Sequence, residues 1–490
     1  MSFKINKFFV ITCLLIGHVY SQDIKNSIPA IGDRVSGVVS LEQEKQIGTQ
    51  FLKQIYAQAP LVNDALIQEF TELLIYKISE TSLVQDRDFK LVIIDDRSLN
   101  AFAAPGGVIG VNAGLFIHAE NEAQFASVIA HELAHVSQRH FARGILRGQD
   151  TNLASALVLI SSIALAIISN NPGAFIAGPA ALAQEQLRYS RIFEREADRF
   201  GFNNLINAGY DPRSMGEMFE NMAKLRKLSG DLPPEFLLTH PVTSSRISDA
   251  FNAVDQVGIV GGKTNSPDFQ FIKGRIEAQY HNSNLNSEAF FKQKYSRNPS
   301  VQNAISYVTV LSKNQKFSEA KNILSTLLEN FPKNIILKVI EAEIFFNDGD
   351  LDRALSIVDE ILKLAPNNFP ASVLKAKVLE FKGEFLFAEQ LVRDQLIKRN
   401  NDPDLWFLLS EIQRSAKNII GYHLSKGEYF ILLGQYDRAL NELKFALSKV
   451  ENNFQVTETI FSKMDEIKNC LLYTSPSPRD LYRSRMPSSA

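Results

Sequence analysis

Cysteine is nearly missing from this chain of 490 residues, which has only Cys13 and Cys470, one near each end. Residues 22–469 therefore cannot form a disulfide, and buried hydrophobic cores must hold the fold together. An excess of basic charge is missing too, because 52 Lys and Arg face 54 Asp and Glu. This balance argues against nucleic acid as a partner. A composition of 45% hydrophobic and 22% charged residues is typical of globular proteins and argues against a polytopic membrane protein.

The two ends are predicted to be separate from the folded protein. Residues 1–21 combine a basic start with an apolar stretch and a small residue at Ser21, the layout of a secretory signal peptide. An uncleaved membrane anchor is the alternative, although the apolar stretch is shorter than the ~20 residues of a span. Residues 470–490 resemble the translation of a sequencing adapter, so we expect them to be foreign and the native sequence to continue after Asn469.

Residues 22–255 are predicted to form a mainly helical domain with a small sheet. Helix and strand patterns alternate here, and β-branched residues mark the short strands. The fold class expected for the whole chain is α+β. The predicted elements are helices over 40–58, 64–81, 121 to about 144 and 190 to about 209, and strands over 89–95 and 108–111.

Residues 269–469 contain a repeat of 34 residues. Ala320, Ala354 and Ala388 follow this spacing, and Gly and Pro residues keep the same register. Small residues at this period are typical of tetratricopeptide repeats, which stack into a solenoid that binds peptides or proteins. Ala439 repeats the pattern 51 residues after Ala388, so we expect an insertion or an extra helix between them. A nonrepetitive helical bundle is the alternative.

The sequence His131-Glu132-Leu-Ala-His135 is an H-E-x-x-H motif inside the helix predicted from residue 121. Residues i and i+4 share a helix face, so both imidazoles can bind one cation. Glu132 then lies beside the water that the cation binds. The motif predicts two metal ligands and a general base on one helix.

A third ligand is expected from another helix, because a catalytic zinc has three protein ligands and one open position. Glu194 and Asp198 share a face of the helix predicted from residue 190. One of them can bind the metal while the other accepts a hydrogen bond from a ligating imidazole. Glu196 points elsewhere. The alternative is that both carboxylates pair with neighbouring arginines on a solvated helix.

Four segments together resemble the gluzincin metallopeptidases related to HtpX and the CAAX prenyl protease. These are HELAH, FEREADRFG after it, NAFAAPGGVIGVNAGL before it and LTHPVTSSR further on. In that family the Glu four residues before the Asp is the ligand, which implies Glu194 as ligand and Asp198 as its support. The resemblance implies peptide-bond hydrolysis at one zinc ion, with Glu132 as the base. The implied zinc ligands are His131, His135 and Glu194.

Two further candidates for a catalytic role follow the second motif. His240 precedes Pro241 and is expected in a loop, where it would stabilise the tetrahedral intermediate or fill the open zinc position and keep the enzyme latent. A surface imidazole is the alternative. Arg246 is expected to bind a carboxylate or the oxyanion, or else to serve as a helix cap or salt bridge. His140 is expected to face away from the histidine pair and to have no role.

The predicted strand before the motif helix is a candidate for substrate binding. Zincins pair extended substrate with an edge strand in the corresponding place, which aligns the scissile bond through main-chain hydrogen bonds. We therefore expect the substrate to pair with Val108, Ile109, Gly110 and Val111.

Leu153 to Ile168 is the strongest apolar run after the signal peptide, but its 16 residues fall short of a membrane span. One crossing would also put His135 and Glu194 on opposite sides of the bilayer. We expect a helix that is buried or rests against a membrane or a client, with membrane insertion as the alternative.

The resemblance and the repeats together predict a periplasmic zinc endopeptidase that also contacts the outer membrane peripherally. The implied clients are misfolded or stalled outer-membrane proteins, and the repeats would recruit clients or the outer-membrane assembly complex. One rival is a chaperone or assembly factor with latent hydrolysis. Another is a membrane-embedded protease, which would need several spans that the chain lacks. The predicted organisation is a signal peptide (1–21), a metallopeptidase domain (22–255), a linker (256–268), a repeat domain (269–469) and the foreign tail (470–490).

Overall fold

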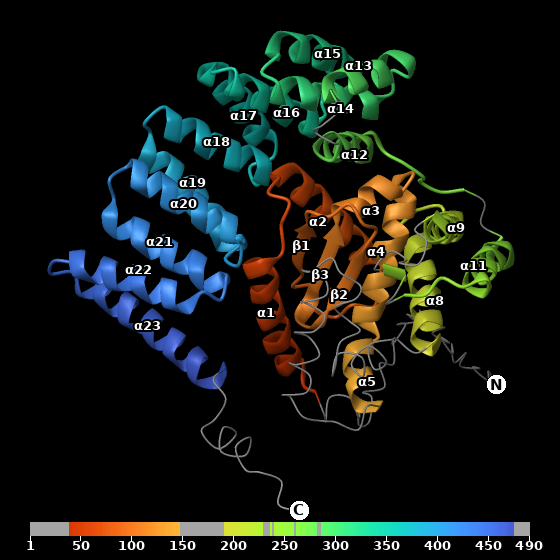
Figure 1. Cartoon of the computed structure of the whole chain (residues 1–490), viewed down its shortest axis with the longest axis horizontal. Helices are drawn as coiled ribbons and strands as arrows, with labels where there is room; N and C mark the ends of the chain where they lie inside the picture. The colour runs from red at the N-terminus through yellow and green to blue at the C-terminus, as the bar shows by residue number, and fades with distance from the viewer. Residues whose placement is uncertain are drawn as a thin grey trace, which may run out of the picture.

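The computed structural model describes residues 39–147, 191–228, 236–237, 240–258, 261–281 and 286–474. The predicted signal peptide and the apolar run from Leu153 to Ile168 lie outside the described residues. Figure 1 shows an N-terminal half, from α1 to α11, and a helical half, from α12 to α23, which curves around one side of it. Among the described residues, no helix combines the length and the apolar character that a membrane crossing requires.

A sheet of three strands lies in the N-terminal half (Figure 1). The strand order is β1-β3-β2, with β1 parallel and β2 antiparallel to β3. The expectation that Val108–Val111 forms an edge strand is therefore wrong, because these residues belong to the central, fully buried strand. The antiparallel strand at the edge beside β3 is β2. The sequence did not reveal this strand, because Ala-Phe-Ala-Ala lacks β-branched residues. The strands are β1 (Lys90–Ile94), β2 (Ala101–Ala104) and β3 (Val108–Asn112).

A short turn, η1 (Pro105–Gly107), joins β2 to β3. Both glycines in it have a positive φ, 71° at Gly106 and 77° at Gly107, a conformation that other residues rarely adopt. The turn therefore explains the Pro-Gly-Gly sequence and reverses the chain so that β2 runs antiparallel to β3.

Capping side chains mark the starts of α1 and α2. Ser40 and Gln43 form a capping box at the start of α1, and Asp64 accepts hydrogen bonds from the first amides of α2. The helices are α1 (Leu41–Gln58), α2 (Ala65–Glu80), α3 (Ala113–His118), α4 (Glu122–Ser137), α5 (His140–Arg147), α8 (Arg191–Asn207), α9 (Arg213–Leu228) and α11 (Ser244–Val257).

The helix predicted to run from residue 121 to about 144 is two helices. The chain breaks after α4 because Arg139 has a φ of 49°, in the left-handed region, and α5 starts at His140. No Gly or Pro marks this position, so the sequence pattern alone could not show the break.

The helical half is built from helix pairs, which confirms the predicted solenoid. The second helices of three successive pairs begin at Phe317, Leu351 and Phe385, 34 residues apart, with Ala320, Ala354 and Ala388 buried. One additional helix, α20, precedes the last pair, as the spacing of 51 residues predicted. The helices are α12 (Pro267–Gln279), α13 (Ser287–Arg297), α14 (Val301–Lys313), α15 (Phe317–Asn330), α16 (Ile335–Asn347), α17 (Leu351–Leu364), α18 (Phe369–Phe381), α19 (Phe385–Lys398), α20 (Pro403–Ser415), α21 (Ile419–Leu432), α22 (Tyr436–Lys449) and α23 (Phe454–Thr474).

The two halves share one hydrophobic core. Its buried side chains form a single cluster, whose first member along the chain is Leu66 and whose last is Leu374. Phe269 of α12 packs against Phe116 and Phe125 of the N-terminal half. The segment before α12, predicted as a linker, is also attached, since its Thr264 carbonyl accepts a hydrogen bond of 2.9 Å from a backbone amide at the start of α4. The helical half is therefore held at a set position on the N-terminal half.

Candidate metal centre

The candidate site lies between α4 and α8, which pack side by side (Figure 1). Every residue of α4 from Glu122 to His135 is buried, so the motif faces the interior of the protein. Gly201 of α8 sits directly against α4, where an added Cβ would lie 3.1 Å from Cα of His131. A larger residue at position 201 would push the helices apart. This close approach brings the carboxylates of α8 to the histidines of α4.

His131, His135 and Glu194 converge between these two helices. The Nε2 atoms of the two histidines are 3.0 Å apart. The Glu194 carboxylate lies 3.6 Å from Nε2 of His131 and 3.5 Å from Nε2 of His135. With His240, one atom from each of these four buried residues lies within 4.8 Å of the other three, an arrangement that could hold a metal ion.

Asp198 and Arg246 support the cluster from behind. Asp198 lies 3.0 Å from Nδ1 of His131, the ring nitrogen that faces away from the cluster, so the Asp198 carboxylate accepts a hydrogen bond from this nitrogen. Arg246 donates two hydrogen bonds of 2.7 Å to Asp198 and lies 2.8 Å from Glu194. The structure thus places Arg246 as a clamp on both carboxylates, in the salt-bridge role that the sequence left open.

His240 lies inside the cluster and is 2% exposed. Its Nδ1 is 3.0 Å from Glu194 and 3.5 Å from Nε2 of His131, while its Nε2 is 3.7 Å from Glu132. The ring stacks on Phe236 at a centroid distance of 4.8 Å. The alternative of a surface imidazole is therefore wrong.

The expectation that His140 faces away from the histidine pair is wrong. Because Arg139 is left-handed, the chain folds back and puts Nδ1 of His140 2.8 Å from Nδ1 of His135. His140 also lies 3.3 Å from Glu196, the acid of α8 that points away from the cluster. His140 thus contacts the outer side of the His135 ring, as Asp198 contacts the outer side of the His131 ring.

The carboxylates and the burial of the cluster shift its pKa values in opposite directions. Burial lowers the pKa of His131, but Asp198 and Glu194 overcome this effect and raise it to about 9. Burial and the charge of His131 hold the pKa of His135 well below its usual range. Burial raises the pKa of Glu132, although His240 and His131 oppose the shift. These directions describe the protein without a metal ion.

The edge strand β2 passes beside the same helix. A backbone hydrogen bond from Ala103 in β2 reaches Glu132 and opposes the rise of its pKa. Phe102, the residue before it, pairs with Gly110 of β3, and its ring fills the space that a Cβ on Gly110 would need. The strand that borders the candidate base is therefore β2, not residues 108–111.

Comparisons with known proteins find one matching family model and several similar proteins. Residues 62–253 match peptidase family M48. The chain is 28% identical to the beta-barrel assembly-enhancing protease of Escherichia coli (strain K12) over 90% of this chain and 92% of that protein. It is 29% identical to the putative beta-barrel assembly-enhancing protease of Vibrio cholerae over 88% of this chain and 90% of that one. It is 34% identical to the mitochondrial metalloendopeptidase OMA1 of Arabidopsis thaliana, over 34% of this chain and 32% of that protein.

Proposed function

Residues 62–253 form a peptidase family M48 domain, and from this premise we propose that the chain is a periplasmic endopeptidase that uses one zinc ion. The observation that carries the proposal is the buried cluster of two histidines and a glutamate beside Glu132. The proposed zinc ligands are His131, His135 and Glu194.

The separations within the cluster fit zinc. Tetrahedral bonds of 2.0–2.1 Å place ligand atoms about 3.3 Å apart. The corresponding separations here are 3.0 Å between the histidines and 3.5 to 3.6 Å from them to Glu194. Among the described residues, one buried oxygen of Glu132 has no hydrogen-bond partner, as suits a carboxylate that accepts a proton during the reaction.

A bound zinc ion would lower the pKa of a water molecule and polarise the peptide carbonyl. Glu132 takes the proton of the attacking water and returns it to the leaving amine. Asp198 and His140 hold the two histidine rings in place, and Arg246 holds Asp198 and Glu194. The substrate backbone pairs with β2, because β2 is the edge strand beside Glu132 in the sheet that the described residues form.

The clients of this peptidase are proposed to be misassembled outer-membrane proteins. Two relatives that match nearly the whole chain are named for assembly of β-barrels. The helical half would recruit these clients or the assembly complex in the periplasm, in peripheral contact with the outer membrane, because stacked helix pairs expose a long curved surface.

A second function, client binding with latent hydrolysis, is favoured by the position of His240. Its Nδ1 lies 3.0 Å from Glu194 and 3.5 Å from Nε2 of His131, separations like those among the proposed ligands, so the ring would be able to take the fourth position at a bound metal. A substrate carbonyl or water would then have to displace it. The protease would be inactive until a client moves the segment that carries His240.

Metal removal tests the main proposal. Treating the purified chain with 1,10-phenanthroline should reduce casein degradation at least about 100-fold, because the attacking water loses its activation. One equivalent of zinc should restore the rate, and a serine-protease inhibitor should leave it unchanged. Casein degradation that is insensitive to chelation would contradict a metal-dependent mechanism.

Substitution of His240 tests the latent state. If His240 blocks the fourth position for most of the time, His240→Ala should raise the initial rate of casein degradation by about tenfold, since the blocked fraction is released. Zinc content should stay at one ion per chain. A rate that falls instead would mean that His240 stabilises the transition state and does not block the site.

A further inference from the structure

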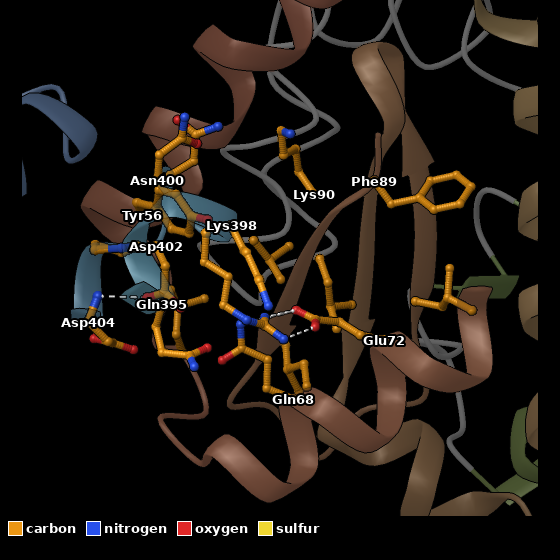
Figure 2. A pocket seen from close by; sticks show the side chains of 18 of the residues that line it. Tyr56, Gln68, Glu72, Phe89, Lys90, Gln395, Lys398, Asn400, Asp402 and Asp404 are labelled. Carbon is orange, nitrogen blue, oxygen red and sulfur yellow. Dashed lines mark hydrogen bonds and ion pairs between the residues drawn. The ribbon is translucent and has the colours of Figure 1, made fainter. Parts of the chain in front are cut away.

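A cavity of about 340 Å³ lies between the two halves, outside the candidate metal centre. Residues 89–93, which include most of strand β1, form one wall, and residues 398–404, at the turn from α19 to α20, form the opposite wall. Figure 2 shows Phe89 and Lys90 on the first side and Asp402 and Asp404 on the other. We refer to this cavity as the β1 cleft.

The outer edge of β1 is open where it lines the cleft. Strand β1 pairs with β3 on its inner side, and its outer side bonds to residues 60–62 only at the far end. There the Ile93 carbonyl accepts a hydrogen bond of 2.9 Å from an amide of that segment. Backbone groups on one side of a strand recur at every second residue, so the amide of Ile93 and both backbone groups of Leu91 also point outward. Among the described residues, no hydrogen bond to these three groups is found outside the pairing with β3.

The opposite wall carries two carboxylates, Asp402 and Asp404, beside the cations Lys398 and Arg399. Asp402 caps α20 through two backbone amides, and Asp404 is the second residue of that helix. Burial and the charge of Asp402 raise the pKa of Asp404 to about 6. The nearby cation Arg399 forms an ion pair with Glu72 (Figure 2). In the described part of the chain, neither Asp402 nor Asp404 forms an ion pair.

We propose that the β1 cleft binds an extended, basic segment of another protein. The segment pairs with the outer edge of β1 as an added strand and places a Lys or Arg side chain between Asp402 and Asp404. The open backbone groups supply hydrogen bonds that do not depend on sequence, and the carboxylates supply the preference for a basic residue. Because the cleft is bounded by both halves, the bound segment contacts the peptidase domain and the repeats at once.

Peptide binding to the full chain tests the proposal, with Glu132→Gln present so that the probe is not cleaved. The probe is a fluorescent nonapeptide of alternating Thr and Val with Lys at its centre, and the comparison peptide has Glu there. Fluorescence anisotropy should show the Lys peptide binding about fivefold more tightly. Asp404→Lys should reverse this preference.

The matched control is Asp437→Lys, which changes an exposed acid at the same position of α22, the second residue of the helix, outside the cleft. It should leave both affinities within about twofold. Hydrogen exchange should show the amides of Leu91 and Ile93 protected by the Lys peptide. Equal affinities for the two peptides, a loss of preference in the control variant, or protection at residues 101–104 and not at 89–94 would each overturn the proposal.

Discussion

Replacing Glu132 by Gln is expected to lower kcat for casein at least about 1000-fold, because the attacking water loses its base and the leaving amine its acid. The amide is isosteric with the carboxyl, and burial already disfavours the charged carboxylate, as its raised pKa shows. The variant should therefore bind one zinc ion per chain and melt at the same temperature as the original protein or slightly above it.

Three measurements check this expectation: initial rates with labelled casein, metal analysis and thermal unfolding. Glu120→Gln is the matched control, since it makes the same change at an exposed position just before α4. Its rate should stay within about twofold. If Glu132→Gln still degrades casein at a tenth of the original rate, Glu132 is not the base.

Replacing Glu194 by Ala should remove both the metal and the activity. The substitution deletes one ligand and leaves the guanidinium of Arg246, which lies 2.8 Å from the carboxylate, without this partner beside the cation. Loss of a ligand and repulsion between like charges act in the same direction. Zinc content should fall below about a tenth of an ion per chain, and kcat/KM should fall at least about 1000-fold.

Glu220→Ala, an exposed acid on the neighbouring helix α9, serves as the control and should keep zinc and activity. Circular dichroism separates loss of the site from loss of the fold, because the helical content of the Glu194→Ala variant should be unchanged. A fully folded Glu194→Ala protein that retains one zinc ion would contradict the proposed ligand set.

The local elements were largely predictable because their signals are local. Ser40 and Asp64 marked the starts of α1 and α2, and the spacing of Ala320, Ala354 and Ala388 marked the helix pairs. A cap depends on residues within one turn of the helix, and the repeat depends on a spacing of 34 residues that can be read along the chain. The same holds for His131 and His135, whose common helix face follows from their spacing alone.

Three features near the site could not be predicted in this way. The edge position of β2 depends on which strands pair, and a poor strand former such as Ala101–Ala104 is recognised only in the sheet. The contact of His140 with His135 depends on one left-handed residue, Arg139, in a sequence without a turn signal. The burial of His240 depends on the packing of a segment more than 100 residues away from the motif.

The sequence by itself determined the identity of the chemical groups, the helices that carry them and the period of the solenoid, because composition and short-range spacing are properties of the chain alone. Only the tertiary structure decided which strand borders Glu132, which histidines surround the candidate metal centre, and that the two halves meet at one core with a cleft between them. These outcomes depend on contacts between residues far apart in the chain, whose free energies are settled by packing and not by any local pattern.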